Sequence, residues 1–110
     1  MGQDTDPGWQ GVVTATDLVA CQAGSVVSRA LVRKPVGTVT VFAFAAGQGL
    51  SEHTAPYDAL VHVLEGEAEV TIAGTPHTVR AGQLLALPAG KAHSLRADKA
   101  FKMMLTMIRA

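Results

Sequence analysis

The chain has 110 residues, of which 48% are hydrophobic and 16% are charged. This length suits one domain and is too short for two domains with separate cores. Nine basic and nine acidic residues give a net charge of zero, and neither sign forms a run. Nucleic acids and anionic membranes need a basic patch, so we expect neither as a partner. Because soluble domains usually carry about one quarter charged residues, the low share here predicts a homodimer that covers part of the surface.

The N-terminal residues and the single cysteine bear on the compartment. Residues 1–9 are polar, contain Gly and Pro, and lack the apolar core of a signal peptide. No run approaches the roughly 18 apolar residues that span a bilayer. Cys21 is the only cysteine, so no internal disulfide can form, which fits a reducing compartment. We therefore expect a cytoplasmic protein with a flexible N-terminal arm at residues 1–10 and one domain at residues 11–110.

Short apolar segments separated by Gly, Pro and charged residues make up the rest of the chain. A single turn of helix is predicted at residues 17–22. Residues 67–72 alternate most clearly between apolar and polar side chains, which is typical of a half-buried strand. A hairpin turn is predicted at Glu65-Gly66 and another turn at residues 74–76. Many short strands with Gly-rich turns indicate a sandwich or a barrel; the expected strand segments are 25–32, 38–45, 59–64, 67–72, 84–87 and 99–108.

The four histidines lie in different settings. His53 follows a turn with two glycines, and His93 follows a Pro-Ala-Gly segment. We expect both at the start of a strand, where barrel corners place side chains at the rim. His62 lies inside an apolar strand segment. His77 follows a Gly-Thr-Pro turn and is predicted to be a solvated hairpin residue.

Two sets of residues have a distinctive spacing, namely Gly47, His53 and Gly66, and then Gly82, Pro88, Gly90 and His93. This spacing resembles the two motifs of the cupin superfamily. The resemblance covers roughly residues 38–108 and implies an all-β fold, a single cupin-type double-stranded β-helix (an RmlC-like jelly-roll barrel). A tightly wound barrel needs positive φ or close backbone approach at the motif glycines. The first motif matches at Gly47, His53 and Gly66, and the second at Gly82, Pro88, Gly90 and His93.

The resemblance also implies a metal site of three histidines and one glutamate at the barrel mouth. His53 and His93 match two of these positions, while alanines stand at the other two and at the Asn position of the second motif, namely Ala55, Ala59 and Ala97. Since neutral imidazole is a common metal ligand, we expect a divalent transition metal (Zn, Ni, Fe, Mn or Cu) on this reduced set. His62 is the candidate third ligand. Strand alternation places it opposite position 59, so only a bulge would turn it inward, and otherwise it lies on the outer face or in a dimer interface.

Three functions stay open, because this fold hosts many chemistries. One is a metal-dependent enzyme acting on a small organic molecule, such as a dioxygenase, isomerase or decarboxylase. Another is a non-catalytic barrel that binds a small molecule without metal, with an apolar mouth in which His53, His93 and Tyr57 orient the ligand. The third is a barrel that serves mainly for dimerisation.

Overall fold

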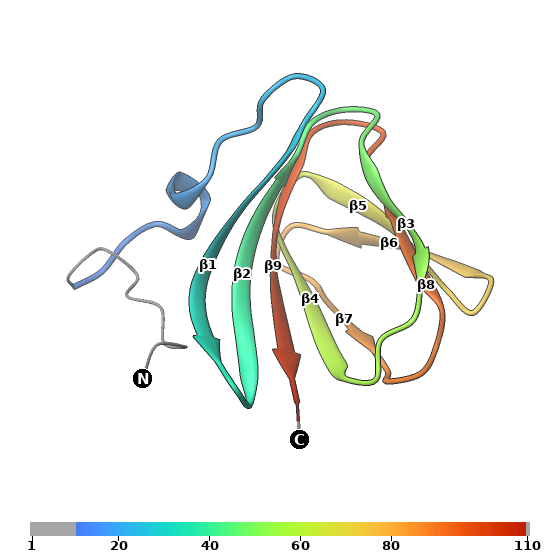
Figure 1. Cartoon of the computed structure of the whole chain (residues 1–110). Helices are drawn as coiled ribbons and strands as arrows, with labels where there is room; N and C mark the ends of the chain where they lie inside the picture. The colour runs from blue at the N-terminus through green and yellow to red at the C-terminus, as the bar shows by residue number, and fades with distance from the viewer. Residues whose placement is uncertain (1–10, 110) are drawn as a thin grey trace.

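The computed structural model describes residues 11–109 and places nine strands in two antiparallel sheets (Figure 1). The arm predicted at residues 1–10 lies outside the described residues. One sheet has five strands in the order β1-β2-β9-β4-β7, and the other has four in the order β3-β8-β5-β6. The elements are η1 (Ala15–Leu18), β1 (Val26–Lys34), β2 (Gly37–Phe44), β3 (Gly49–His53), β4 (Asp58–Glu65), β5 (Glu67–Ile72), β6 (Thr75–Arg80), β7 (Leu84–Leu87), β8 (His93–Arg96) and β9 (Phe101–Ile108).

The all-β prediction is confirmed, while two local elements, a turn and a helical turn, differ in position from the prediction. The predicted turn at 74–76 starts one residue too late and ends two residues too late, because the turn consists of Ala73 and Gly74 and strand β6 begins at Thr75. The helical turn begins at Ala15 rather than at residue 17 and is a 3-10 turn. Among residues 11–109 no helix is long and apolar enough to cross a membrane.

The main core lies between the two sheets. Successive side chains of a strand point to opposite faces, so β4 and β5 bury every second residue. Phe44 and Phe101 stack at the centre with ring centroids 4.6 Å apart and an interplanar angle of 5°. This cluster consists of Phe44, Ala59, Val61, Val63, Ala68, Val70, Val79, Leu87, Leu95, Ala97, Phe101 and Met103.

A second cluster covers part of the outer face of the five-stranded sheet. Val19, which follows η1, is buried there with Leu31 and Val41. The Lys102 ammonium donates a hydrogen bond to the Thr16 carbonyl oxygen at 2.8 Å. The segment around η1 therefore packs on the outside of the barrel and leaves the space between the sheets free of it (Figure 1).

The motif glycines adopt backbone conformations that other residues disfavour. All four predicted positions, Gly47, Gly66, Gly82 and Gly90, have positive φ. At Gly66, where φ is +77°, a Cβ atom would lie 2.9 Å from the Ala100 carbonyl oxygen and 3.0 Å from the Phe101 Cβ. Only glycine lets the β4–β5 turn approach the chain before β9 this closely.

The β5–β6 hairpin contains an alanine in a conformation that alanine disfavours. Ala73 has φ +49° and Gly74 has φ +84°, and they join the paired residues Ile72 and Thr75. Positive φ at both positions is the pattern of a type I′ turn, which favours Asn-Gly. Ala73→Asn should raise the free energy of unfolding by about 0.5–1 kcal/mol, because asparagine tolerates this region better. Urea unfolding measures the change, and an Ala73→Val control should lose stability; equal stability of all three proteins would contradict the expectation.

Candidate functional site

Two histidines that are 40 residues apart in the sequence meet at one end of the barrel. Strands β3 and β8 pair antiparallel and bring His53 opposite His93. The Nε2 atoms of the two rings lie 3.1 Å apart, and the ring centroids are separated by 4.4 Å. His93 opens β8 as predicted, whereas His53 is the last residue of β3 rather than the first of a strand.

Burial differs between the two rings. His93 is 8% exposed and lies two residues before the buried Leu95 in β8. The two side chains therefore share the face of the strand that points to the interior. His53 is exposed at the rim, after a register shift between Leu50 and His53. The pair therefore spans the boundary between the buried interior and solvent.

The backbone fixes which nitrogen of each ring carries a proton. His53 Nδ1 lies 2.8 Å from the Ser51 carbonyl oxygen, and His93 Nδ1 lies 3.1 Å from the Lys91 carbonyl oxygen. A carbonyl oxygen only accepts, so each Nδ1 is the donor and carries the hydrogen. In two neutral rings of this tautomer, both Nε2 lone pairs face each other. A proton or a cation between the two nitrogens satisfies both.

The donor arrangement fits a transition metal ion. Two imidazole nitrogens at about 2.1 Å from one metal, with an angle of about 90–110° between them, lie about 3.0–3.4 Å apart. The 3.1 Å between the Nε2 atoms of His53 and His93 falls in that range. Histidines that bind metal usually donate their other N–H to a carbonyl or carboxylate, as both rings do here. Imidazole suits Zn, Cu, Fe and Ni.

A tight turn aims the His93 ring. The Lys91 N–H donates to the Pro88 carbonyl oxygen at 3.3 Å, and Gly90 has φ +79°, as in a type II turn. The turn brings the Lys91 carbonyl back toward the His93 ring, whose Nδ1 donates to it. The Pro-x-Gly-x-x-His spacing thus encodes both the turn and the direction of Nε2.

The other predicted ligand does not join the pair. His62 lies in β4 between Val61 and Val63, which are fully buried in the interior. Its register partners are Met104 and Leu84, so it occupies the outer face of the five-stranded sheet. The irregularity in β4 falls after Val63 and does not turn His62 inward. Within residues 11–109 no group of three or more His, Cys, Asp or Glu side chains is placed to hold a metal ion.

The two motif positions that lack ligands are apolar in the structure. Ala59 is 8% exposed and lies in register with Leu87 and Met107. Ala55 is half-buried in the loop between β3 and β4. Neither offers a donor atom, so methyl groups stand where the family pattern has a histidine and a glutamate.

Two further residues singled out from the sequence are Tyr57 and His77. The Arg109 guanidinium carbon lies 5.5 Å from the centre of the Tyr57 ring. The role of Tyr57 as a ligand contact stays a prediction. His77 is a correction: it is part of β6, opposite Val70 and on the same side as the buried Val79, and is half-buried. His77 lies two residues before the apolar Val79, and this spacing in the sequence was the signal that both side chains share one face of a strand.

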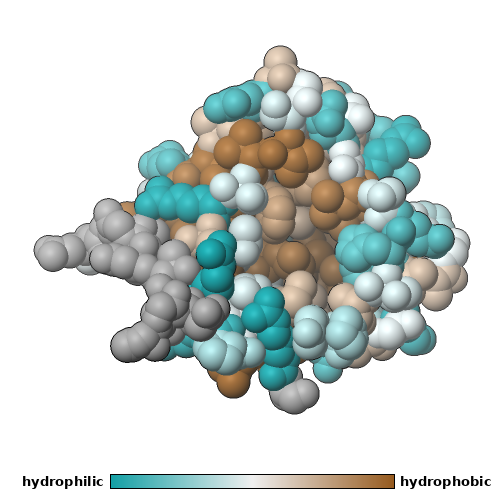
Figure 2. All heavy atoms as spheres, in the orientation of Figure 1, coloured by the Kyte–Doolittle hydropathy of each residue, from teal (hydrophilic) through white to brown (hydrophobic). Residues whose placement is uncertain are grey.

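Half-buried apolar side chains line the interior around the core. In the space-filling view, apolar surface gathers in the middle of the face shown and polar residues surround it (Figure 2). The half-buried hydrophobic residues that pack against the main core are Val26, Phe42, Leu50, Ile72, Leu85 and Leu105. The space between the sheets is therefore bordered mostly by hydrocarbon.

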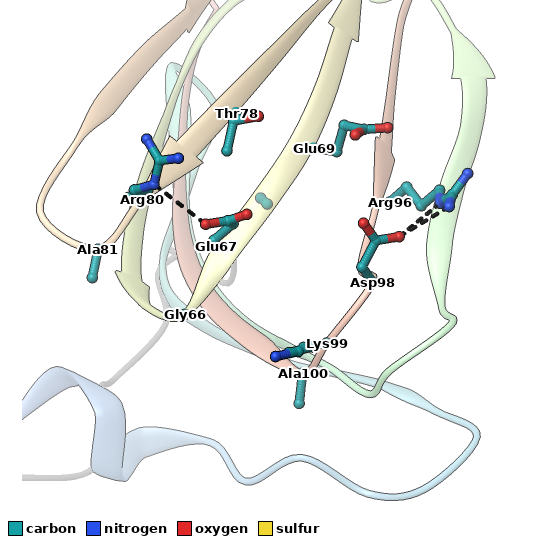
Figure 3. A pocket seen from close by; sticks show the side chains of 11 residues that line it. Gly66, Glu67, Glu69, Thr78, Arg80, Ala81, Arg96, Asp98, Lys99 and Ala100 are labelled. Atoms are coloured by element: carbon teal, nitrogen blue, oxygen red, sulfur yellow. Dashed lines mark hydrogen bonds and ion pairs between the residues drawn. The ribbon is translucent and has the colours of Figure 1, made fainter.

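One cleft among the described residues lies away from the histidines. It has a volume of about 610 Å³ and lies on the outer face of β5, β6 and β8 (Figure 3). Four of its six charged side chains form ion pairs: Arg80 Nε lies 3.3 Å from Glu67 Oε1, and Arg96 Nη2 lies 2.9 Å from Asp98 Oδ1. All four side chains are more than half exposed. We assign the candidate site to the histidine pair, because exposed ion pairs satisfy one another and such pairs are common on the solvated face of a sheet.

The two-sheet barrel with a histidine pair at one end is the architecture of a cupin. A family model described as a cupin domain matches residues 40–109. The chain belongs to this family.

Solved structures show the same relationship. The conserved protein SPY1581 from Streptococcus pyogenes, whose function is unknown, is 34% identical, with a TM-score of 0.92 over 100% of this chain and 96% of that chain. A cupin 2 conserved barrel domain protein from Leptotrichia buccalis is 38% identical with a TM-score of 0.82, over 84% of this chain and 45% of that chain. A cupin superfamily protein from Desulfitobacterium hafniense is 24% identical, with a TM-score of 0.91 over 98% and 99%. No curated protein matches the chain.

Proposed function

We propose that this cupin barrel binds one divalent transition metal ion through the Nε2 atoms of His53 and His93, and that a small organic molecule binds beside it. The distance of 3.1 Å between the two Nε2 atoms, with both Nδ1 atoms already donating to carbonyls, carries this proposal. A bound metal would supply Lewis acidity at a site with several open positions. His53 and His93 would hold it, and the Ser51 and Lys91 carbonyls would orient the two rings.

The surroundings support a ligand with an apolar body and its own donor atoms. Ala55 and Ala59 stand where the family pattern has two further ligands, so water or the ligand itself would complete the coordination. The half-buried walls are hydrocarbon, which suits a mostly apolar molecule. Binding without turnover and catalysis both fit this arrangement.

A metal-free binding barrel is the second candidate. The Nε2 atoms of His53 and His93 are also within hydrogen-bond distance of each other, so a proton shared between the rings would satisfy the same lone pairs. In that case the mouth would bind its small molecule through imidazole hydrogen bonds alone. The homodimer and the cytoplasmic location remain predictions.

Metal titration separates the two candidates. We expect the protein, stripped of metal with a chelator, to bind one Ni²⁺ or Zn²⁺ per chain in isothermal titration calorimetry. In NMR spectra, Co²⁺ should broaden the ring signals of His53 and His93 and leave those of His62 unchanged, because His62 lies on the outer face. Absence of both heat and selective broadening would contradict metal binding and favour the metal-free barrel.

A further inference from the structure

The loops that carry the two histidines touch each other. One loop, residues 54–57, follows His53 and leads into β4, and the other, residues 88–92, leads from β7 into His93. They lie at the same end of the barrel (Figure 1). Strand pairing of β3 with β8 fixes the backbone near the pair, but neither loop belongs to a strand.

One side chain connects the 88–92 loop to the start of β4, directly after the 54–57 loop. The Ala89 N–H donates to Asp58 Oδ1 at 2.9 Å, although the two residues are 31 apart in the sequence. A backbone bond runs beside it, from the Gly90 N–H to the Ala55 carbonyl oxygen at 2.8 Å. Asp58 is exposed, so this contact does not result from burial of the carboxylate.

The contact reaches His93 through the turn. Ala89 and Gly90 are the two central residues of the turn that the Lys91 N–H closes onto Pro88. The carbonyl of Lys91 then accepts the Nδ1 hydrogen of His93. A change in the turn therefore changes the direction of this carbonyl, and with it the direction of the His93 ring.

We propose that Asp58 is a positioning residue of the histidine pair: its carboxylate holds the Pro88–Lys91 turn and thereby aims Nε2 of His93 at Nε2 of His53. This inference rests on the proposed function for its effect on metal affinity, but its effect on the ring does not depend on metal. Partners that orient a metal-binding histidine typically change metal affinity by 10–100-fold when they are removed. Because the Gly90–Ala55 bond remains, we expect an effect near the lower end, about 10-fold.

The test compares Asp58→Ala, Asp58→Asn and Asp98→Ala. Asparagine keeps an oxygen that accepts the Ala89 hydrogen, so Asp58→Asn should bind Ni²⁺ nearly as well as the unchanged protein, whereas Asp58→Ala should bind it about 10-fold more weakly. Asp98 is the matched control: it is an exposed carboxylate with an arginine partner, and it follows the far end of β8. Asp98→Ala should leave the Ni²⁺ affinity unchanged.

A second measurement without metal keeps the inference separate from the proposed function. In ¹⁵N NMR spectra of the imidazole rings, Asp58→Ala should shift the His93 Nδ1 signal or broaden it, and Asp58→Asn should restore it. If the unchanged protein binds no metal, the proposed function fails and the ring spectra alone decide the role of Asp58. Unchanged ring signals in Asp58→Ala, or an equal loss of affinity in Asp58→Asn, would overturn the inference.

Discussion

Replacing His93 by alanine should weaken Ni²⁺ binding at least about 100-fold, which corresponds to about 2.7 kcal/mol. The proposed site has only two imidazole ligands, and one alone would not hold a metal at the rim of the barrel. His93 is the buried member of the pair, so its loss also removes the Nε2 that faces His53. Calorimetric titration of the chelator-treated protein measures the change.

His62→Ala is the matched control for this variant. His62 is also a strand histidine, but it lies on the outer face of the five-stranded sheet and should not affect the affinity. Urea unfolding of both variants excludes the trivial explanation that His93→Ala fails to fold. If His93→Ala and His62→Ala bind Ni²⁺ equally well, the metal lies somewhere other than the pair.

Replacing Phe101 by alanine should lower the free energy of unfolding by about 4 kcal/mol. Phe101 is fully buried, its ring stacks on Phe44 at 4.6 Å between centroids, and its backbone borders the tight approach of Gly66. Truncation removes the transfer energy of the ring and leaves a cavity that the surrounding strands cannot close, since both sheets are tied by hydrogen bonds. Urea unfolding followed by circular dichroism gives the value.

Phe101→Leu separates cavity formation from loss of a hydrophobic side chain. Leucine fills most of the volume, so this variant should lose much less stability than Phe101→Ala, by about 1.5 kcal/mol. If Phe101→Ala lowers the free energy of unfolding by less than about 1.5 kcal/mol, the surrounding side chains must close the cavity, which would contradict the expectation.

Alternation and turn residues predicted most of the fold. Segment 67–72 coincides with β5, and segment 84–87 coincides with β7, because apolar runs bounded by glycine or proline have few other solutions. Strands β3 and β6 were missed. In β3 only Leu50 is apolar, and in β6 the polar residues and Pro76 near the start obscure the alternation. Proline is tolerated there because β6 is an edge strand, which becomes clear only once the sheet order is known.

The candidate site was predicted less completely than the fold. Strand alternation alone indicated that the His62 side chain points to the opposite face from position 59. The register of β4 with β9 agrees, because it pairs His62 with Met104 on the outer face of the five-stranded sheet. The contact between His53 and His93 depends on β3 pairing with β8, which no local pattern encodes. The turn-borne contact of Asp58 is similarly a product of tertiary structure, because its partner is a backbone N–H that any residue except proline would provide.

The pairing of β3 with β8 has a consequence for the order of events during folding. His53 and His93 are separated by 40 residues that include β4, β5, β6 and β7, so the pair forms only after a long loop closes. A metal held by both rings would bind only the state in which β3 and β8 are paired, and it would therefore stabilise that state relative to partly folded ones. It would therefore slow unfolding more than it accelerates folding, and the metal would act on the lifetime of the barrel rather than on its formation.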